Sequence, residues 1–103
     1  MTPTLAARIE QREAVLARVR MLLIESLGVR RTPDEIDPDT ALFGSGLGLD
    51  SIDAVELVVS LDTEFNVELP NDVFGRAEMR TVNGLVDLVL AAESAETRDG
   101  VDR

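Results

Sequence analysis

The sequence predicts an all-α protein with three principal helices, one short helix and a long first loop. Three stretches carry apolar residues at spacings of three, four and seven, the pattern of a helix that buries one face. No stretch shows the sustained alternation of apolar and polar residues that a half-buried strand requires. A chain of 103 residues has room for one domain with one modest core, so we expect the helices to pack antiparallel in a small bundle.

The first helix is expected to start at Thr2 and Pro3, a capping hydroxyl followed by a proline at the first helical position. Gly28 is expected to form its C-terminal cap. The predicted core face consists of Leu5, Ile9, Leu16, Val19, Leu23 and Leu27. Charged residues between Arg8 and Glu13 interrupt this pattern, so we expect the first two turns to project into solvent.

Residues 29–49 are expected to form a long ordered loop, because Pro33, Pro38 and three glycines exclude a continuous helix. Apolar side chains spaced along the loop can anchor it over the helix ends: Ile36, Leu42, Phe43, Leu47 and Leu49.

Two patterns in this loop suggest ligand sites, but the residues around them do not support either site. The glycine-rich residues 44–48 suggest a phosphate-binding loop, but no strand precedes them and no Lys-Ser/Thr pair follows. The acidic residues 34–39 suggest calcium. However, a loop counted from Asp37 has Leu42 where glycine is required and Gly48 where the bidentate glutamate belongs. We therefore expect no metal site.

The second helix begins at the end of this loop, where the sequence reads GLDSIDAVELVVSLDTEF from residue 48 to residue 65. Asp50 is a favourable N-cap, and Asp53 can reach back to it in a capping box. This arrangement places Ser51 at the first helical position, with its hydroxyl toward solvent. The predicted core face consists of Ala54, Leu57, Val58, Leu61 and Phe65.

A second apolar stripe on this helix consists of Ile52, Val55 and Val59. It lies beside Ser51 and is flanked by Glu56 and Asp62. This is more apolar surface than folding requires, and its acidic frame is typical of a docking surface for a partner with a basic rim. The alternatives are a wider core seam or a homodimer contact.

After the second helix, residues 71–74 are expected to form one short turn closed by Gly75, with buried side chains at Val73, Phe74 and Met79. The final helix is expected to start at a Thr81 cap. Its core face consists of Val82, Leu85, Val86 and Val89. Residues 94–103 are polar and unpatterned, so we expect a folded domain over residues 1–93 and a disordered tail.

Composition excludes several classes of function. The net charge of −10 makes nucleic acid and anionic membranes poor partners, and it favours a monomer. The chain contains no cysteine and no histidine, so it cannot build a disulfide, a thiolate nucleophile or a Ser-His-Asp triad. We find no signal peptide and no long apolar run, which makes a cytoplasmic location the default expectation.

The stretch LGLDSIDAVELVVSLDTEF resembles the signature of acyl carrier proteins, which are small, acidic four-helix proteins. These carry acyl chains on a 4′-phosphopantetheine arm attached to the serine of a D-S-[LI] motif. Asp50, Ser51 and Ile52 match that motif, and looser similarity covers residues 5–92.

The resemblance implies that Ser51 receives phosphopantetheine from coenzyme A through a separate transferase that uses Mg²⁺. The protein would then be a carrier and a substrate, without catalysis of its own. Its partners would be acyl-handling enzymes with basic docking surfaces, such as a ketosynthase, an acyltransferase or ligase, a reductase and a dehydratase. The partner surface carried over by the resemblance consists of Asp50, Ile52, Asp53, Val55, Glu56, Val59 and Asp62.

Some positions depart from fatty-acid carriers. Thr63 stands where many have an acid, and Leu49 stands where alanine is frequent. These departures indicate a carrier for a specialised lipid or polyketide-type pathway. Two other hypotheses remain: an aminoacyl or peptidyl carrier, which usually has a G-G-[DH]-S approach to its serine, and an unmodified acidic helical adaptor.

Overall fold

The fold is all-α, as predicted. The computed structural model describes the backbone of residues 4–101 and the side chains as far as residue 94. The α-helices are α1 (Leu5–Leu27), α2 (Ser51–Phe65) and α3 (Val82–Val101). Three short 3₁₀ helices lie in the connections: η1 (Pro33–Glu35), η2 (Val73–Gly75) and η3 (Ala77–Arg80). Within residues 4–101 the only β-type pairings are isolated bridges. The short turn predicted at residues 71–74 corresponds to η2, whereas η3 was not predicted.

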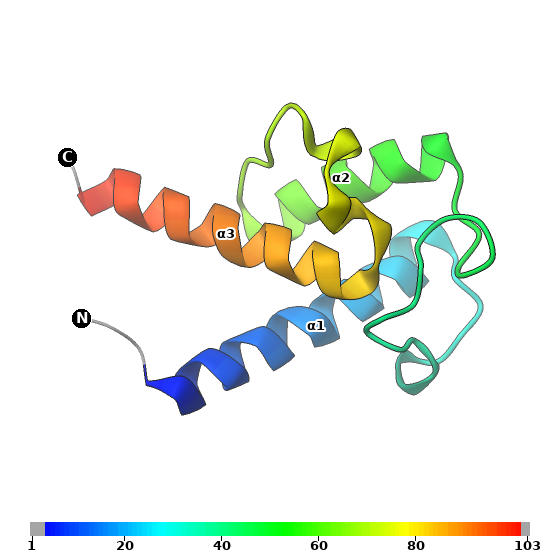
Figure 1. The fold of residues 1–103 in the computed structure, drawn as a ribbon, viewed down its shortest axis with the longest axis horizontal. Coiled ribbons are helices and arrows are strands. Elements are labelled where there is room, and N and C mark those ends of the chain that lie inside the picture. The colour runs from blue at the N-terminus through cyan, green and yellow to red at the C-terminus, as the bar shows by residue number, and fades with distance from the viewer. Residues whose placement is uncertain (1–3, 102–103) are drawn as a thin grey trace.

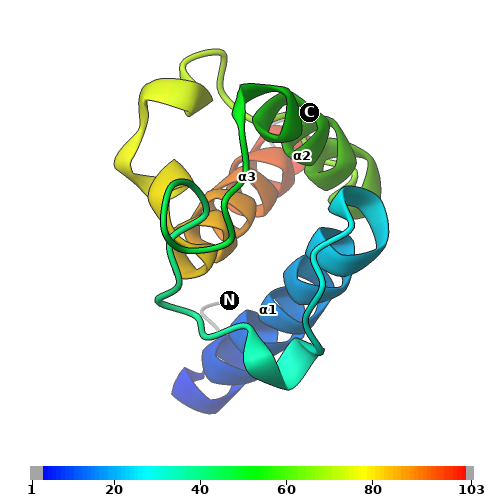
Figure 2. The ribbon, with the colours of Figure 1, turned by 90° about the vertical axis from the view of Figure 1, so that its right-hand side faces the viewer.

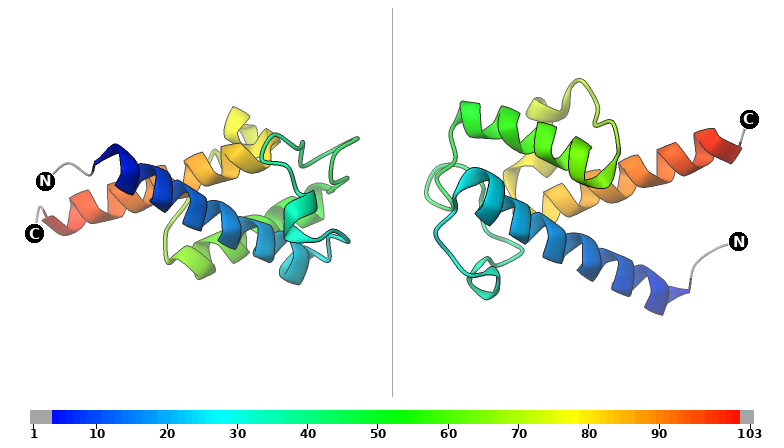
Figure 3. Two further views of the ribbon diagram at one scale, coloured as in Figure 1. Left: turned by 90° about the horizontal axis from the view of Figure 1, so that it is seen from below. Right: turned by 180° about the vertical axis from the view of Figure 1, so that it is seen from behind.

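The core lies between the three α-helices. α1 packs against both α2 and α3, and η3 packs against α3. α1 and α3 approach each other in the middle of the molecule and diverge toward the two chain ends (Figures 1 and 3). Fully buried side chains from all three helices fill the interior, among them Leu23, Leu57 and Leu85. No helix in the described part of the chain combines the length and hydropathy that crossing a bilayer requires.

α1 begins at Leu5, and the Thr4 hydroxyl caps it by accepting a hydrogen bond from the Ala7 amide at 3.1 Å. Thr2 and Pro3, the predicted start, lie outside the described residues. Gly28 ends the helix in the left-handed region at φ 71°, as predicted. Leu5 is 74% exposed and Ile9 is 50% exposed, so the first turns project beyond the core as expected. The assignment of these two residues to the core face was therefore wrong, because the helix extends past the segments that could cover them.

Arg12, which interrupts the apolar pattern of α1, connects that helix to α3. Its guanidinium donates to Asp87 Oδ1 at 2.6 Å and to Asn83 Oδ1 at 2.7 Å. The backbone amide of Asn83 donates to the Pro38 carbonyl at 2.7 Å. Arg12 therefore links α1 to α3, and Asn83 links α3 to the long loop.

The loop between α1 and α2 gathers at the end of the bundle opposite the chain termini (Figure 2). Ile36, Leu42 and Leu49 are buried, and Phe43 and Leu47 pack against the core from its margin, as the spacing of apolar residues predicted. The Leu42 amide also donates to the Arg80 carbonyl of η3 at 2.8 Å. These anchors hold the loop against η3 and bring it to the start of α2.

The connection from α2 to α3 differs from the prediction at one residue. Val73 and Met79 are buried as expected, but Phe74 is 53% exposed. The reason is that η2 is a single turn, so only one of two consecutive side chains can face the core.

The last helix, α3, starts as predicted, with the Gly84 amide donating to Thr81 Oγ1 at 3.1 Å. The backbone of α3 stays helical to Val101, past residue 94, where the predicted disordered tail begins. The predicted tail stays a prediction. Residues 102 and 103 lie outside the described part, and the predicted domain boundary at residue 93 stays a prediction.

Candidate functional site

The N-terminus of α2 is capped reciprocally by two aspartates. The Asp53 amide donates to Asp50 Oδ1 at 2.9 Å, and the Asp50 amide donates to Asp53 Oδ2 at 3.1 Å. Asp50 has extended backbone angles and α2 begins at the next residue, so Ser51 occupies the first helical position as predicted. The serine is exposed. The capping box thus presents its hydroxyl at a fixed point on the surface.

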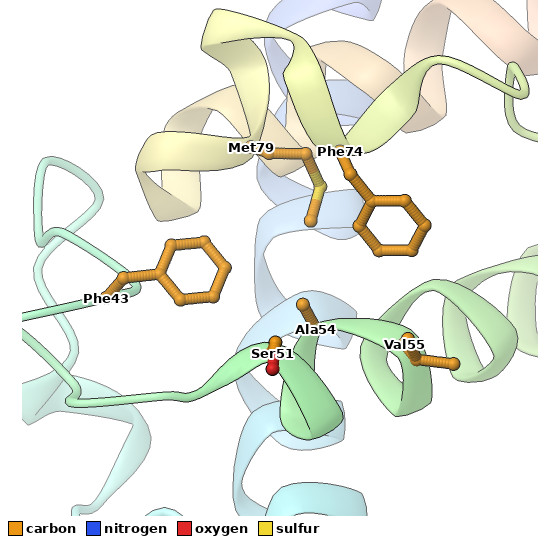
Figure 4. A pocket seen from close by; sticks show the side chains of 6 residues that line it. All are labelled: Phe43, Ser51, Ala54, Val55, Phe74 and Met79. Carbon is orange, nitrogen blue, oxygen red and sulfur yellow. The ribbon is translucent and has the colours of Figure 1, made fainter.

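Ser51 stands at the edge of an apolar pocket of about 400 Å³. The other residues that line the pocket are Phe43, Ala54, Val55, Phe74 and Met79. Figure 4 shows the rings of Phe43 and Phe74 on either side of the Met79 side chain, with Ala54 and Ser51 on the opposite wall. The walls come from the long loop, from α2 and from the two turns η2 and η3. Three separate segments therefore meet beside one serine hydroxyl.

The second apolar stripe of α2 faces solvent. Ile52 is 76% exposed, Val59 is 58% exposed and Val55 is 53% exposed. In contrast, Ala54, Leu57 and Leu61 on the predicted core face are buried. The helix thus has two apolar faces, as predicted, and Val55 joins the exposed face to the pocket.

The acids assigned to the partner surface differ in their environments. Glu56 is exposed, whereas Asp53 is half-buried and takes part in the capping box. Asp62 is also half-buried, and its Oδ1 accepts a hydrogen bond from the Leu69 amide at 3.2 Å. Asp62 therefore holds the connection that follows α2, a structural role that the sequence did not reveal.

A family model described as "Phosphopantetheine attachment site" matches residues 17–89, well over half of the chain. The chain belongs to the phosphopantetheine-attachment family. Domains of this family are carriers that hold 4′-phosphopantetheine covalently. The matched range includes the capping box, Ser51 and every residue that lines the pocket.

The residues of this carrier domain fit the prosthetic group. Attachment requires an exposed hydroxyl, and Ser51 is exposed at a helix terminus where Asp50 accepts a hydrogen bond from the Asp53 amide. The neighbouring pocket is lined mainly by apolar side chains, so it suits an apolar group tethered to that hydroxyl. Among the described residues, no three acidic, histidine or cysteine side chains converge as metal ligands.

Four pocket residues were not assigned to the site from the sequence. Phe43 was interpreted as a loop anchor, and Ala54, Phe74 and Met79 as buried residues. A signal was present nonetheless, because the chain has three phenylalanines and no other aromatic residue, and two of them flank the motif that contains Ser51.

Proposed function

We propose that Ser51 is the attachment residue and that this protein carries acyl intermediates as thioesters, for a fatty-acid or polyketide-type pathway of specialised lipid synthesis. The observation that carries the proposal is the position of Ser51. It is exposed at the first turn of α2, between the two capping aspartates, within the family match. When bound, the group supplies a flexible arm with a terminal thiol, which this cysteine-free chain lacks.

The proposed modification requires a separate transferase. The Ser51 Oγ–phosphorus bond forms, the pyrophosphate bond of coenzyme A breaks, and adenosine 3′,5′-bisphosphate leaves. The serine proton must go to a base on the transferase, because this chain has no histidine and the nearest acids, Asp50 and Asp53, accept bonds from backbone amides. The contribution of this chain is to hold the hydroxyl in place.

The proposed partners are that transferase and acyl-handling enzymes with basic docking surfaces. The exposed stripe of Ile52, Val55 and Val59 offers apolar contact, and Glu56 offers negative charge beside it. Asp50, Asp53 and Asp62 contribute charge at its margins in addition to their structural bonds. A monomeric state and a cytoplasmic location belong to the same proposal.

The test is the intact mass of the purified protein before and after incubation with coenzyme A, Mg²⁺ and a broad-specificity phosphopantetheinyl transferase. We expect the wild type to gain one phosphopantetheine and Ser51→Ala to gain none. Ser45→Ala is the matched control, because Ser45 is also exposed and lies in the loop just before α2; it should gain as the wild type does. A folded wild type that gains nothing with several transferases would contradict the proposal and favour an unmodified adaptor.

A further inference from the structure

The interior of the bundle is closed in this structure, whereas the pocket beside Ser51 is open to its hydroxyl. Leu57 and Leu61 of α2 and Leu85 of α3 are each 0% exposed, and none of them lines the pocket. Cargo tethered at Ser51 can therefore reach the pocket walls without displacing the packed side chains between the helices.

The pocket has the size of a compact group. Benzene occupies engineered apolar cavities of about 150 Å³, so about 400 Å³ accepts a ring together with part of its connection to the arm. A long straight chain would fill the same space and then continue into solvent.

The pocket walls are rich in aromatic side chains, which are rare in this chain. Of its three phenylalanines, Phe43 and Phe74 both border the pocket, and the Met79 side chain lies between their rings (Figure 4). Aromatic groups prefer edge-to-face or offset contacts with such rings, and a thioether sulfur also packs favourably against them. Phe74 is 53% exposed, so covering it with cargo also removes apolar surface from water.

From this geometry, and on the basis of the proposed attachment at Ser51, we infer that the pocket is a seat for a compact, planar apolar acyl group held between Phe43 and Phe74. The occupant is the cargo of the arm itself. The arm leaves Ser51 on the α2 side and folds back, so that the acyl group lies against Met79 and Ala54. Phe74, which is more exposed than Phe43, discriminates a planar group from a straight chain of equal carbon number.

The test compares two cargoes of nine carbons. Cinnamoyl-coenzyme A and nonanoyl-coenzyme A are used with the transferase, and loading is verified by mass. The first measurement is the set of nuclear Overhauser contacts between the cargo and the protein. We expect the cinnamoyl ring to contact the Met79 methyl group and the Phe74 ring. Cinnamoyl contacts confined to residues outside the pocket, or nonanoyl contacts to Leu57 and Leu85, would overturn the inference.

The second measurement is protection of the thioester from hydroxylamine, relative to the same acyl group on free coenzyme A. Protection of the cinnamoyl form should exceed that of the nonanoyl form by roughly two- to tenfold, the range expected for aromatic contacts. Phe74→Leu should abolish this excess. Phe65→Leu is the matched control, because Phe65 lies at the other end of α2 and does not line the pocket; it should keep the excess. Equal protection of both cargoes in the wild type would contradict the inference.

Chemical attachment of the cargo tests the pocket independently of whether a transferase modifies Ser51. Because the chain has no cysteine, Ser51→Cys creates a unique thiol that a haloacetamide bearing a flexible cinnamoyl-amide arm can alkylate without any transferase. Ring contacts to Met79 and Phe74 in that adduct support the pocket even if the wild type gains no phosphopantetheine. Their absence contradicts the pocket even if the wild type is loaded at Ser51.

Discussion

Asp50 and Asp53 each accept a hydrogen bond from the backbone amide of the other, at 2.9 and 3.1 Å, across the first turn of α2. Ser51 lies between them in the sequence and is exposed. The two aspartates therefore fix the backbone on both sides of the proposed attachment point. Their carboxylates also supply the negative charge that stabilises a helix N-terminus.

Replacement of Asp50 should separate its capping role from its charge. Asp50→Ala removes the acceptor for the Asp53 amide, and we expect it to lower the free energy of unfolding by about 1 kcal/mol. Asp50→Asn keeps a good N-cap, so its loss should be smaller by at least half. Urea denaturation of the unmodified protein measures both. An Asp50→Asn variant as unstable as Asp50→Ala would show that charge, and not capping, dominates at this position.

Gly84 is expected to tolerate no side chain although it lies in a helix. A Cβ at this position would meet the Glu78 carbonyl oxygen at 2.0 Å, so Gly84→Ala must push η3 away from α3. Alanine normally stabilises a helix relative to glycine, but here we expect a loss of about 1–3 kcal/mol from overpacking. Thermal unfolding of Gly84→Ala and the wild type shows whether the substitution lowers or raises stability.

Gly75→Ala is the matched control for that change. A Cβ at Gly75 meets nothing within 4 Å and its φ is not positive, so we expect a change within about 0.5 kcal/mol. If Gly84→Ala were as stable as Gly75→Ala, the close packing of η3 on α3 would be wrong. The position of Met79, which η3 carries into the pocket, would then also be wrong.

Features set by one or two helical turns could be predicted from the sequence. The capping box of Asp50 and Asp53, the exposed stripe beginning at Ile52, and the caps at Gly28 and Thr81 all depend on neighbours in the chain. Their side-chain chemistry and spacing are sufficient to determine them. The proposed attachment point belongs to this group, which is why its surroundings could be described in advance.

Features that join distant segments could not be predicted in the same way. Phe43 and Phe74 line one pocket although they lie in the long loop and in η2, two segments that are far apart in the sequence. In the sequence, Arg12 only interrupts an apolar pattern. Its contacts with Asp87 and Asn83 depend on how α3 packs, so the pattern could not indicate them. Apolar periodicity identifies a buried face, but it does not indicate which segment covers that face.

Asp62 was assigned to the partner surface, and its bond to the Leu69 amide predicts a second role. Asp62→Ala removes the acceptor from a half-buried amide, so we expect a stability loss of about 1 kcal/mol. Asp62→Asn keeps an acceptor oxygen and should keep most of that stability while it removes the charge. The two variants, compared by denaturation and by the rate of phosphopantetheine transfer at low salt, show whether Asp62 serves folding, docking or both. Equal stability of Asp62→Ala and wild type would exclude the structural role.

Glu56 should contribute to docking alone. It is exposed on α2 between Val55 and the buried Leu57, so a lysine there should fold normally while it reverses a charge beside the exposed stripe. We expect Glu56→Lys to slow phosphopantetheine transfer at low salt by a factor on the order of three or more, because opposite charges accelerate the encounter of two proteins. The difference should shrink as the ionic strength rises through about 0.15 M, where the screening length falls to about 8 Å.

Glu13→Lys is the control for Glu56→Lys, because it makes the same change in net charge at an exposed site on α1. If docking depends on the acidic residues of α2, the transferase should modify Glu13→Lys at nearly the wild-type rate and Glu56→Lys more slowly. Equal slowing by both variants would mean that the transferase responds to net charge and not to this surface. Wild-type rates for both at low salt would remove Glu56 from the proposed docking surface and leave its apolar stripe as the main contact.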